Sequence, residues 1–112
     1  MKKVEAIIRE EQLPVVRAAL EEVGYPGITL SSVRGHGRQR GVKQHWRGKE
    51  FTVDLLPKVK LELIVGDAHA AKIVACIAEN ARTGAVGDGK IWVSAIESVT
   101  RVRTGETGDV AL

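Results

Sequence analysis

The chain has 112 residues, of which 44% are hydrophobic and 28% charged, and its formal net charge is +3. This length suits a single domain over residues 1–112, and the composition lies far from that of disordered or fibrous proteins. The one cysteine, Cys76, excludes an internal disulfide, and its apolar sequence neighbours predict a buried structural thiol. Because so small a core buries limited apolar surface, we expect the chain to self-associate.

The amino-terminal segment carries charged residues where a secretion signal needs an apolar core. No apolar run in the sequence approaches the length that spans a membrane. We therefore expect a cytoplasmic protein that does not insert into a membrane.

The first part of the chain predicts a strand, a helix and a second strand. Apolar residues alternate over residues 2–9 with the period of a sheet that buries one face. Over residues 12–23 they recur at three- and four-residue steps, which predicts an amphipathic helix that ends at Gly24. Residues 28–34 form the second predicted strand.

Residues 37–56 follow without a sustained helix or strand period. Connections in compact domains usually have about four to six residues, and longer ones are mostly functional or mobile. We interpret this segment as a functional loop, and a pair of unrecognised strands is the alternative.

Basic residues cluster at the start of this segment and within it. They are Arg34, Arg38, Arg40, Lys43, Arg47 and Lys49. Such a cluster favours anionic ligands or partners. Nucleic acid is disfavoured, because Trp46 is the only aromatic platform before Phe51.

The second part of the chain repeats the order of strand, helix and strand. Residues 59–65 alternate as a strand, and Asp67 is expected to cap the following helix, which ends near Thr83. The expected buried stripe of this helix is Ala70, Val74, Ile77 and Ala81. Residues 90–95 form a further strand, with a short extension over residues 99–103.

Two tandem βαβ units of this kind predict an α+β, ferredoxin-like fold with an antiparallel sheet. Both helices would cover one face of the sheet. The other face would keep valine, leucine and isoleucine side chains to bury, and a symmetric oligomer would bury them.

Two segments are candidates for binding an anion. The glycines of residues 84–90 would let backbone N–H groups approach a phosphate, with Lys90 adding charge, although a plain turn is the alternative. Arg101 and Arg103 lie two apart on a predicted strand and would share one face. They could hold one anion together or form a solvated cationic stripe.

The sequence gives no positive support for enzyme chemistry or for a zinc site. His36, His45 and His69 share no metal-ligand spacing. No serine, histidine and aspartate arrangement and no carboxylate pair indicates a nucleophile or a general acid.

Several stretches together carry a specific resemblance. They are Gly35–Gly41, Trp46–Phe51, Asp54–Lys60, Thr83–Val93 and Arg101–Glu106. Along its whole length the chain resembles the PII nitrogen regulatory signal transduction proteins. The first three stretches are similar to the entrance, apex and exit of that family's T-loop, here about residues 37–56.

The resemblance implies a homotrimer that binds ATP or ADP in each cleft between subunits. The residues that match nucleotide contacts are Thr29, Gly37, Arg38, Gln39, Ile64, Gly87, Asp88, Gly89, Lys90, Arg101 and Arg103. Of these, Thr29 and Ile64 match positions around the adenine. Gln39 also matches the residue that helps to hold Mg²⁺ between ATP and 2-oxoglutarate. Lys58 matches the residue that pairs with the keto acid, and Arg9 matches a cation near that site.

By the same resemblance, the chain is a non-enzymatic regulator of an ammonium transporter or of an enzyme of nitrogen metabolism. Arg47 matches the apex arginine that contacts the transporter. Phe51 stands where many members carry a modified tyrosine, so we expect regulation by effectors alone unless Thr52 or another residue is modified. A PII-like regulator with another effector or partner and a slow nucleotide hydrolase are the alternatives.

Overall fold

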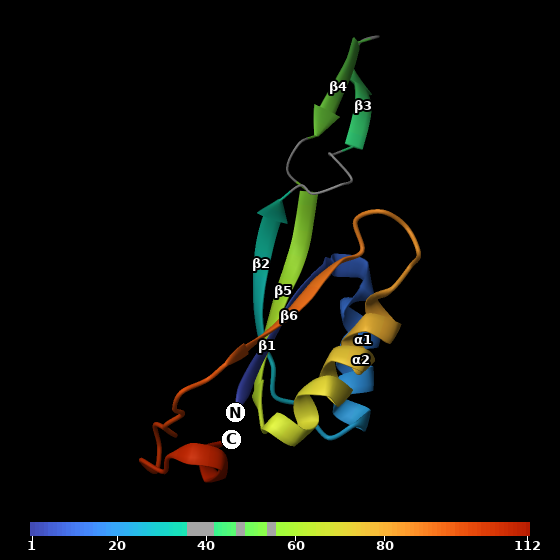
Figure 1. Cartoon of the computed structure of the whole chain (residues 1–112). Coiled ribbons are helices and arrows are strands. Elements are labelled where there is room, and N and C mark those ends of the chain that lie inside the picture. The colour runs from blue at the N-terminus through green and yellow to red at the C-terminus, as the bar shows by residue number, and fades with distance from the viewer. Residues whose placement is uncertain (36–41, 47–48, 54–55) are drawn as a thin grey trace.

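The computed structural model describes the backbone of residues 1–35, 42–46, 49–53 and 56–112 (Figure 1). Four strands form one sheet in the order β2-β5-β1-β6, and every neighbouring pair is antiparallel. They are β1 (Lys2–Arg9), β2 (Thr29–Gly35), β5 (Leu56–Val65) and β6 (Gly89–Ala95). This order confirms the ferredoxin-like fold that the two βαβ units predicted.

Both helices, α1 (Leu13–Glu22) and α2 (Ala70–Ala81), lie on one face of the sheet (Figure 1). A short 3₁₀ turn precedes each of them, Glu10–Gln12 before α1 and Asp67–His69 before α2. A third 3₁₀ turn, Gly108–Ala111, lies near the carboxyl end. Within the residues placed by the structure, no helix has the length and apolar content that crossing a bilayer requires.

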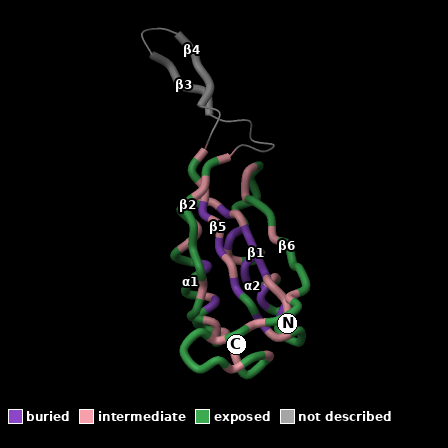
Figure 2. Tube along the Cα trace, turned by 90° about the vertical axis from the view of Figure 1, so that its left-hand side faces the viewer, coloured by how far each residue is buried: buried purple, intermediate pink, exposed green. Residues whose placement is uncertain are grey.

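The hydrophobic core fills the layer between the helices and the sheet (Figure 2). The alternating positions of β1 and β5 and the stripes of the two helices supply it. The stripe expected for α2 is confirmed at Ala70, Ile77 and Ala81 and wrong at Val74, which is only half-buried. Ile73 is buried instead, because it too lies three residues after Ala70 and four before Ile77. Its buried members are Val4, Ala6, Ile8, Val16, Leu20, Val59, Leu61, Leu63, Val65, Ala70, Ile73, Cys76, Ile77 and Ala81. Burial raises the pKa of the Cys76 thiol, in agreement with the structural role expected of it.

The opposite face of the sheet, which we call the open face, carries a charged network at its centre. Glu5 is only 7% exposed, and its carboxylate lies 2.8 Å from Lys3 Nζ and 3.1 Å from Lys60 Nζ. Lys60 also pairs with Glu62 at 3.4 Å. These two lysines hold the pKa of Glu5 below its ordinary value. The expectation of an apolar second face therefore holds only in part.

The apolar residues of the open face lie around this network. By strand register they are Ile7, Val33, Leu56, Ile64 and Trp92, which lie on the side of the sheet opposite the core positions of β1 and β5. Ile64 and Trp92 are 42% and 38% exposed, so the face retains apolar surface beside its charges.

Two short strands, β3 (Val42–Trp46) and β4 (Lys49–Val53), pair as a separate antiparallel sheet within residues 37–56. The expectation of a segment without strands is wrong, and the alternative of two unrecognised strands is correct. The two strands are held together by hydrogen bonds between them. Polar and apolar residues are mixed in both strands, so the sequence shows no alternating pattern that would predict them.

Two further expectations about local structure are wrong. The Asp67 carboxylate accepts a hydrogen bond from the amino-terminal ammonium of Met1 at 2.7 Å. Among the described residues no side chain caps α2, which begins after His69. The predicted strand over residues 99–103 is reduced to one isolated bridge between Thr100 and Thr107.

Gly89 joins the loop after α2 to the start of β6, where the backbone passes very close to β1. A Cβ atom at this position would lie 1.8 Å from the carbonyl oxygen of Ile7, and the φ angle of +108° already disfavours any side chain. We expect Gly89→Ala to lower the free energy of unfolding by about 3 kcal/mol. Urea unfolding at one protein concentration measures this change.

Gly27→Ala is the matched control, because a Cβ atom there meets nothing within 4 Å. Its unfolding free energy should stay within about 0.5 kcal/mol of the wild-type value. Equal unfolding midpoints for Gly89→Ala and Gly27→Ala would show that the close approach to Ile7 does not constrain the fold.

Candidate functional site

A cleft of about 610 Å³ lies between the β2–β5 pair and the loop that joins α2 to β6. One wall is the glycine-rich segment 84–89. Three cations line the cleft, namely Arg34, Lys58 and Lys90. Its apolar lining consists of Ile7, Val33, Leu56 and Trp92. The cleft therefore combines positive charge, accessible backbone and an apolar surface, which suits an anion attached to an organic group.

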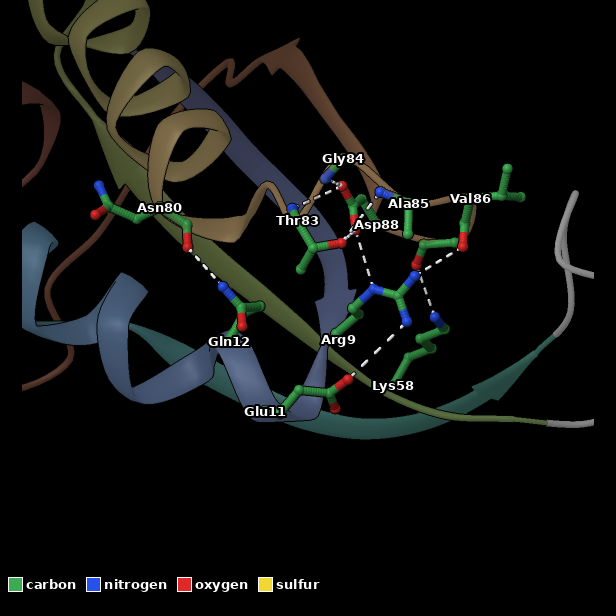
Figure 3. Close-up of polar contacts among 11 residues, drawn as sticks. Arg9, Glu11, Gln12, Lys58, Asn80, Thr83, Gly84, Ala85, Val86 and Asp88 are labelled. Carbon is green, nitrogen blue, oxygen red and sulfur yellow. Dashed lines mark hydrogen bonds and ion pairs between the residues drawn. The ribbon is translucent and has the colours of Figure 1, made fainter. Parts of the chain in front are cut away.

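The carboxylate of Asp88 holds the loop that forms the glycine-rich wall (Figure 3). Its Oδ2 atom accepts hydrogen bonds from the backbone N–H groups of Thr83 at 2.8 Å and Gly84 at 2.9 Å. Its Oδ1 atom accepts from the Thr83 hydroxyl and, at 3.0 Å, from Arg9 Nε. These donors, the Thr83 hydroxyl first, hold the pKa of Asp88 far below its ordinary value.

Two cations from the sheet reach carbonyl groups of the same loop (Figure 3). Arg9, at the end of β1, donates from Nη2 to the Val86 carbonyl at 2.7 Å. Lys58, on β5, donates from Nζ to the Gly87 carbonyl at 2.8 Å. Burial, and then the charge of Arg9, lower the pKa of Lys58. The loop is thus bound to the sheet at two successive carbonyl groups.

The structure gathers one group of the predicted site residues at this cleft. It consists of Arg9, Lys58, Gly87, Asp88, Gly89 and Lys90. The glycine-rich segment, for which a plain turn was the alternative, lines the cleft beside two cations. Its geometry fits the anion-binding prediction, although a bound anion itself stays a prediction.

Thr29 and Ile64 lie at the other end of the sheet. In the register, Ile64 is opposite Lys3, whereas Lys58 is opposite Arg9. Strand geometry separates Lys58 from Ile64 by about 20 Å. One chain therefore does not bring the residues matched to the adenine next to the glycine-rich loop.

Arg101 and Arg103 are also far from that loop. The strand β6 begins at Gly89 beside Ile8 and ends at Ala95 beside Lys2, and the arginines follow that far end (Figure 1). The prediction that they share one face of a strand is wrong, because the chain turns there. The Gly105 N–H donates to the Arg101 carbonyl at 2.8 Å and closes the turn.

The Arg101 guanidinium already has partners within the carboxyl-terminal segment. Its Nη1 atom lies 2.9 Å from Glu106 Oε1, and its Nη2 atom donates to the Val110 carbonyl at 2.9 Å. Arg103 is exposed in the same turn. A ligand held by Arg101 would therefore have to replace these contacts.

The remaining predicted residues, Gly37, Arg38, Gln39 and Arg47, lie outside the described residues. Gln39 is the predicted Mg²⁺ contact, and that role stays a prediction. In the part of the chain that the structure describes, no three histidine, cysteine, aspartate or glutamate side chains are grouped to hold a metal ion.

Sequence reasoning did not assign a role to Thr83 or to the apolar lining of the cleft. Thr83 has a recognisable signal, since a hydroxyl residue and an aspartate five positions apart flank a glycine-containing turn. Trp92 also has a recognisable signal in the sequence, because the alternation of β6 places it opposite Glu5 on the open face.

Comparisons with known proteins agree with this architecture. A sequence model of the family described as Nitrogen regulatory protein P-II matches residues 1–106. The chain is 51% identical over 108 residues to the Nitrogen regulatory protein P-II of Rhizobium meliloti (strain 1021), covering 96% of each chain. It is 49% identical over 112 residues to the Nitrogen regulatory protein P-II of Rhodospirillum rubrum, covering 100% of each chain. Nitrogen regulatory protein P-II 2 of Methanothermobacter thermautotrophicus is 46% identical over 112 residues, which is 100% of this chain and 97% of that protein.

The low pKa of Asp88 predicts how the loop contributes to stability at different pH values. A carboxyl group whose pKa is lower in the folded protein stabilises it above the unfolded-state pKa of about 4, and this contribution is lost as the pH falls toward the folded-state value. We expect Asp88→Asn to unfold at lower urea concentration than the wild type at neutral pH. The difference should shrink below about pH 4.

Glu21→Gln, which removes one exposed acid of α1, controls for the loss of a negative charge. A difference between Asp88→Asn and wild type that stays constant over the whole acidic range would contradict the contacts described for this carboxylate.

Proposed function

Since the chain belongs to the nitrogen regulatory protein P-II family, we propose that it senses adenine nucleotides and 2-oxoglutarate and regulates nitrogen metabolism through residues 37–56. The family confirms the resemblance found in the sequence. The relatives are named regulatory proteins, which favours a non-enzymatic role. The effectors, the partner and the oligomer are the parts of this proposal that experiment has to decide.

The cleft beside the glycine-rich loop is the observation that carries the proposal. Lys58 and Lys90 line it together with the segment 84–89, whose carbonyl groups are held by cations of the sheet. Positive side chains and ordered backbone donors are what the phosphates of ATP or ADP require. The apolar lining that includes Trp92 offers contact to the rest of the nucleotide.

A homotrimer would complete this nucleotide site. Thr29 and Ile64 match adenine contacts but lie about 20 Å along the sheet from the loop of the same chain. Arg101 and Arg103 follow the same far end. A second copy of the chain can bring its own far end to the cleft of the first, which would place all of these residues around one nucleotide.

The site proposed for 2-oxoglutarate adjoins the site proposed for the phosphates. Lys58, the match to the keto-acid contact, is hydrogen-bonded to Gly87 in the glycine-rich loop. A Mg²⁺ ion held by phosphate oxygens, by the keto acid and by Gln39 would need few further protein ligands. Because each ligand would help to build the site of the other, their affinities should be reciprocally coupled.

Residues 37–56 are proposed to contact a partner in a way that depends on which effectors are bound. The partner is either an ammonium transporter or an enzyme of nitrogen metabolism. Arg47 is the residue of this segment that matches a transporter contact. A segment that has one arrangement with ADP and another with Mg-ATP and 2-oxoglutarate would select its partner by the bound effectors.

Calorimetric titration of 2-oxoglutarate into the purified protein tests the proposal. We expect binding with Mg-ATP and none with ADP or without nucleotide, because the metal and the phosphates complete the keto-acid site. Lys58→Gln should weaken 2-oxoglutarate binding more than ATP binding. Lys72→Gln, a charge loss on the exposed side of α2, is the matched control and should bind both ligands as the wild type does.

The outcomes of this titration separate the proposed function from its alternatives. If ATP binds but 2-oxoglutarate binds under no condition, the protein is a P-II regulator of another signal. If neither ATP nor ADP binds, the nucleotide-sensing role is wrong. Release of phosphate from ATP by the wild type, abolished in Lys90→Ala, would instead support a slow hydrolase.

Mass spectrometry of native protein tests whether effectors alone regulate this chain. Phe51 has no hydroxyl group to carry a nucleotidyl modification. We expect peptides that cover residues 37–56 to have their unmodified masses under nitrogen-rich and nitrogen-poor growth. A nucleotidyl or phosphoryl group on Thr52 or another residue of this segment would show a covalent switch and contradict the proposal.

A further inference from the structure

Thr83, Asp88 and Arg9 form a connected set of contacts at the base of the glycine-rich loop, which we call the loop clamp. We propose that the loop clamp positions the backbone of residues 84–88 for phosphate binding and that its three side chains do not touch the nucleotide. This inference rests on the proposed function, since it concerns how the same cleft binds ATP or ADP. It assigns a role to Thr83 and replaces the ligand contacts expected of Asp88 and Arg9.

The Asp88 carboxylate has no acceptor position left for a ligand. An ionised carboxylate offers about four acceptor positions, and Asp88 receives four hydrogen bonds, two at each oxygen. It has no proton to donate to a phosphate oxygen, because its pKa is held far below the ordinary value. A direct contact between this carboxylate and a phosphate would be repulsive. Asp88 therefore acts through the loop.

Arg9 forms the second part of the loop clamp (Figure 3). Its guanidinium donates to Asp88 Oδ1 from Nε and to the Val86 carbonyl from Nη2, while Nη1 lies 4.0 Å from Glu11 Oε1. Its side chain is 15% exposed. The planar fork thus bridges the Asp88 carboxylate and the Val86 carbonyl, which the single ammonium group of a lysine does not reproduce.

Thr83 connects the carboxylate to the turn itself. Its hydroxyl donates to Asp88 Oδ1 and accepts a hydrogen bond from the Ala85 N–H at 3.2 Å. One hydroxyl group therefore fixes two points of the loop. Serine retains both contacts, whereas valine has nearly the same shape as threonine and makes neither of them.

The loop clamp and Lys58 together determine which way the backbone donors of the loop point. In a trans peptide the C=O and N–H groups point in opposite directions. Arg9 and Lys58 hold the carbonyl groups of Val86 and Gly87, so the N–H groups of Gly87 and Asp88 point away from these cations. Donors that are fixed before binding lower the cost of ordering them around a phosphate.

Calorimetric titration of ADP into three single variants and one double variant tests this inference. We expect Thr83→Val to weaken ADP binding about tenfold and Thr83→Ser to restore most of the affinity. Arg9→Lys should weaken ADP binding about as much as Thr83→Val does, because lysine keeps the positive charge but cannot contact Asp88 and the Val86 carbonyl at once. The double variant Thr83→Val/Arg9→Lys should lose less affinity than the two single losses combined, since both act on one network.

Amide hydrogen exchange of the ligand-free protein, followed by NMR, reports on the loop clamp without any nucleotide. We expect the N–H groups of Gly84 and Ala85 to exchange faster in Thr83→Val than in wild type or Thr83→Ser, because they donate to Asp88 and Thr83. The amides at the centres of β1 and β5 should keep their protection, which shows that the sheet is intact.

The two measurements distinguish failure of this inference from failure of the proposed function. If the wild type binds ADP and Thr83→Val binds it equally well, the positioning role is wrong and nucleotide sensing stands. If only Arg9→Lys keeps full affinity, Arg9 acts by its charge and the bridge is wrong. If the wild type binds neither ADP nor ATP, the proposed function fails and the positioning role fails with it, whatever the amide exchange shows.

Discussion

The hydrogen-bonded carboxylate of Asp88 is the contact on which the architecture of the cleft depends. It joins three parts of the fold, because Asp88 lies just before β6 and its donors come from the end of β1 and from the residues after α2. Four hydrogen bonds to one charged group stabilise this arrangement of the loop. Arg9 and Lys58 then attach this loop to the sheet through the carbonyl groups of Val86 and Gly87.

The close approach of β6 to β1 imposes a second constraint on the same loop. Gly89 lies against the Ile7 carbonyl, where a side chain would overlap the backbone. The loop therefore has to enter the sheet directly after Asp88, which keeps the carboxylate near Arg9. The requirement for glycine at position 89 and the polar network around Asp88 together fix the course of this loop. The register of the sheet positions the cations of β5 and β6 that line the cleft.

A single chain contains only part of the proposed nucleotide site. The charged network around Glu5 occupies the centre of the open face, and it separates the cleft at one end of the sheet from Thr29 and Ile64 at the other. Glu5 is buried, whereas Lys3, Lys60 and Glu62 are partly exposed, so each charge of this network has an opposite charge beside it before any oligomer forms. In the proposed oligomer such a face would pack against further copies at its apolar positions, including Ile64 and Trp92, and the charges that it buries would already be paired.

The sequence by itself determined the four strands of the main sheet, both helices, most of the core and the family, because these depend on local periodicity and on motifs. It also located the glycine-rich segment and the cations Lys58 and Lys90. Only the tertiary structure decided what each polar group contacts: Arg9 and Asp88 are 79 positions apart, and Arg101 bonds to its own carboxyl-terminal segment. The strands β3 and β4 were likewise recognised only from their pairing in the structure. Spacing predicts neighbours along one element, whereas hydrogen bonds between elements depend on how those elements pack.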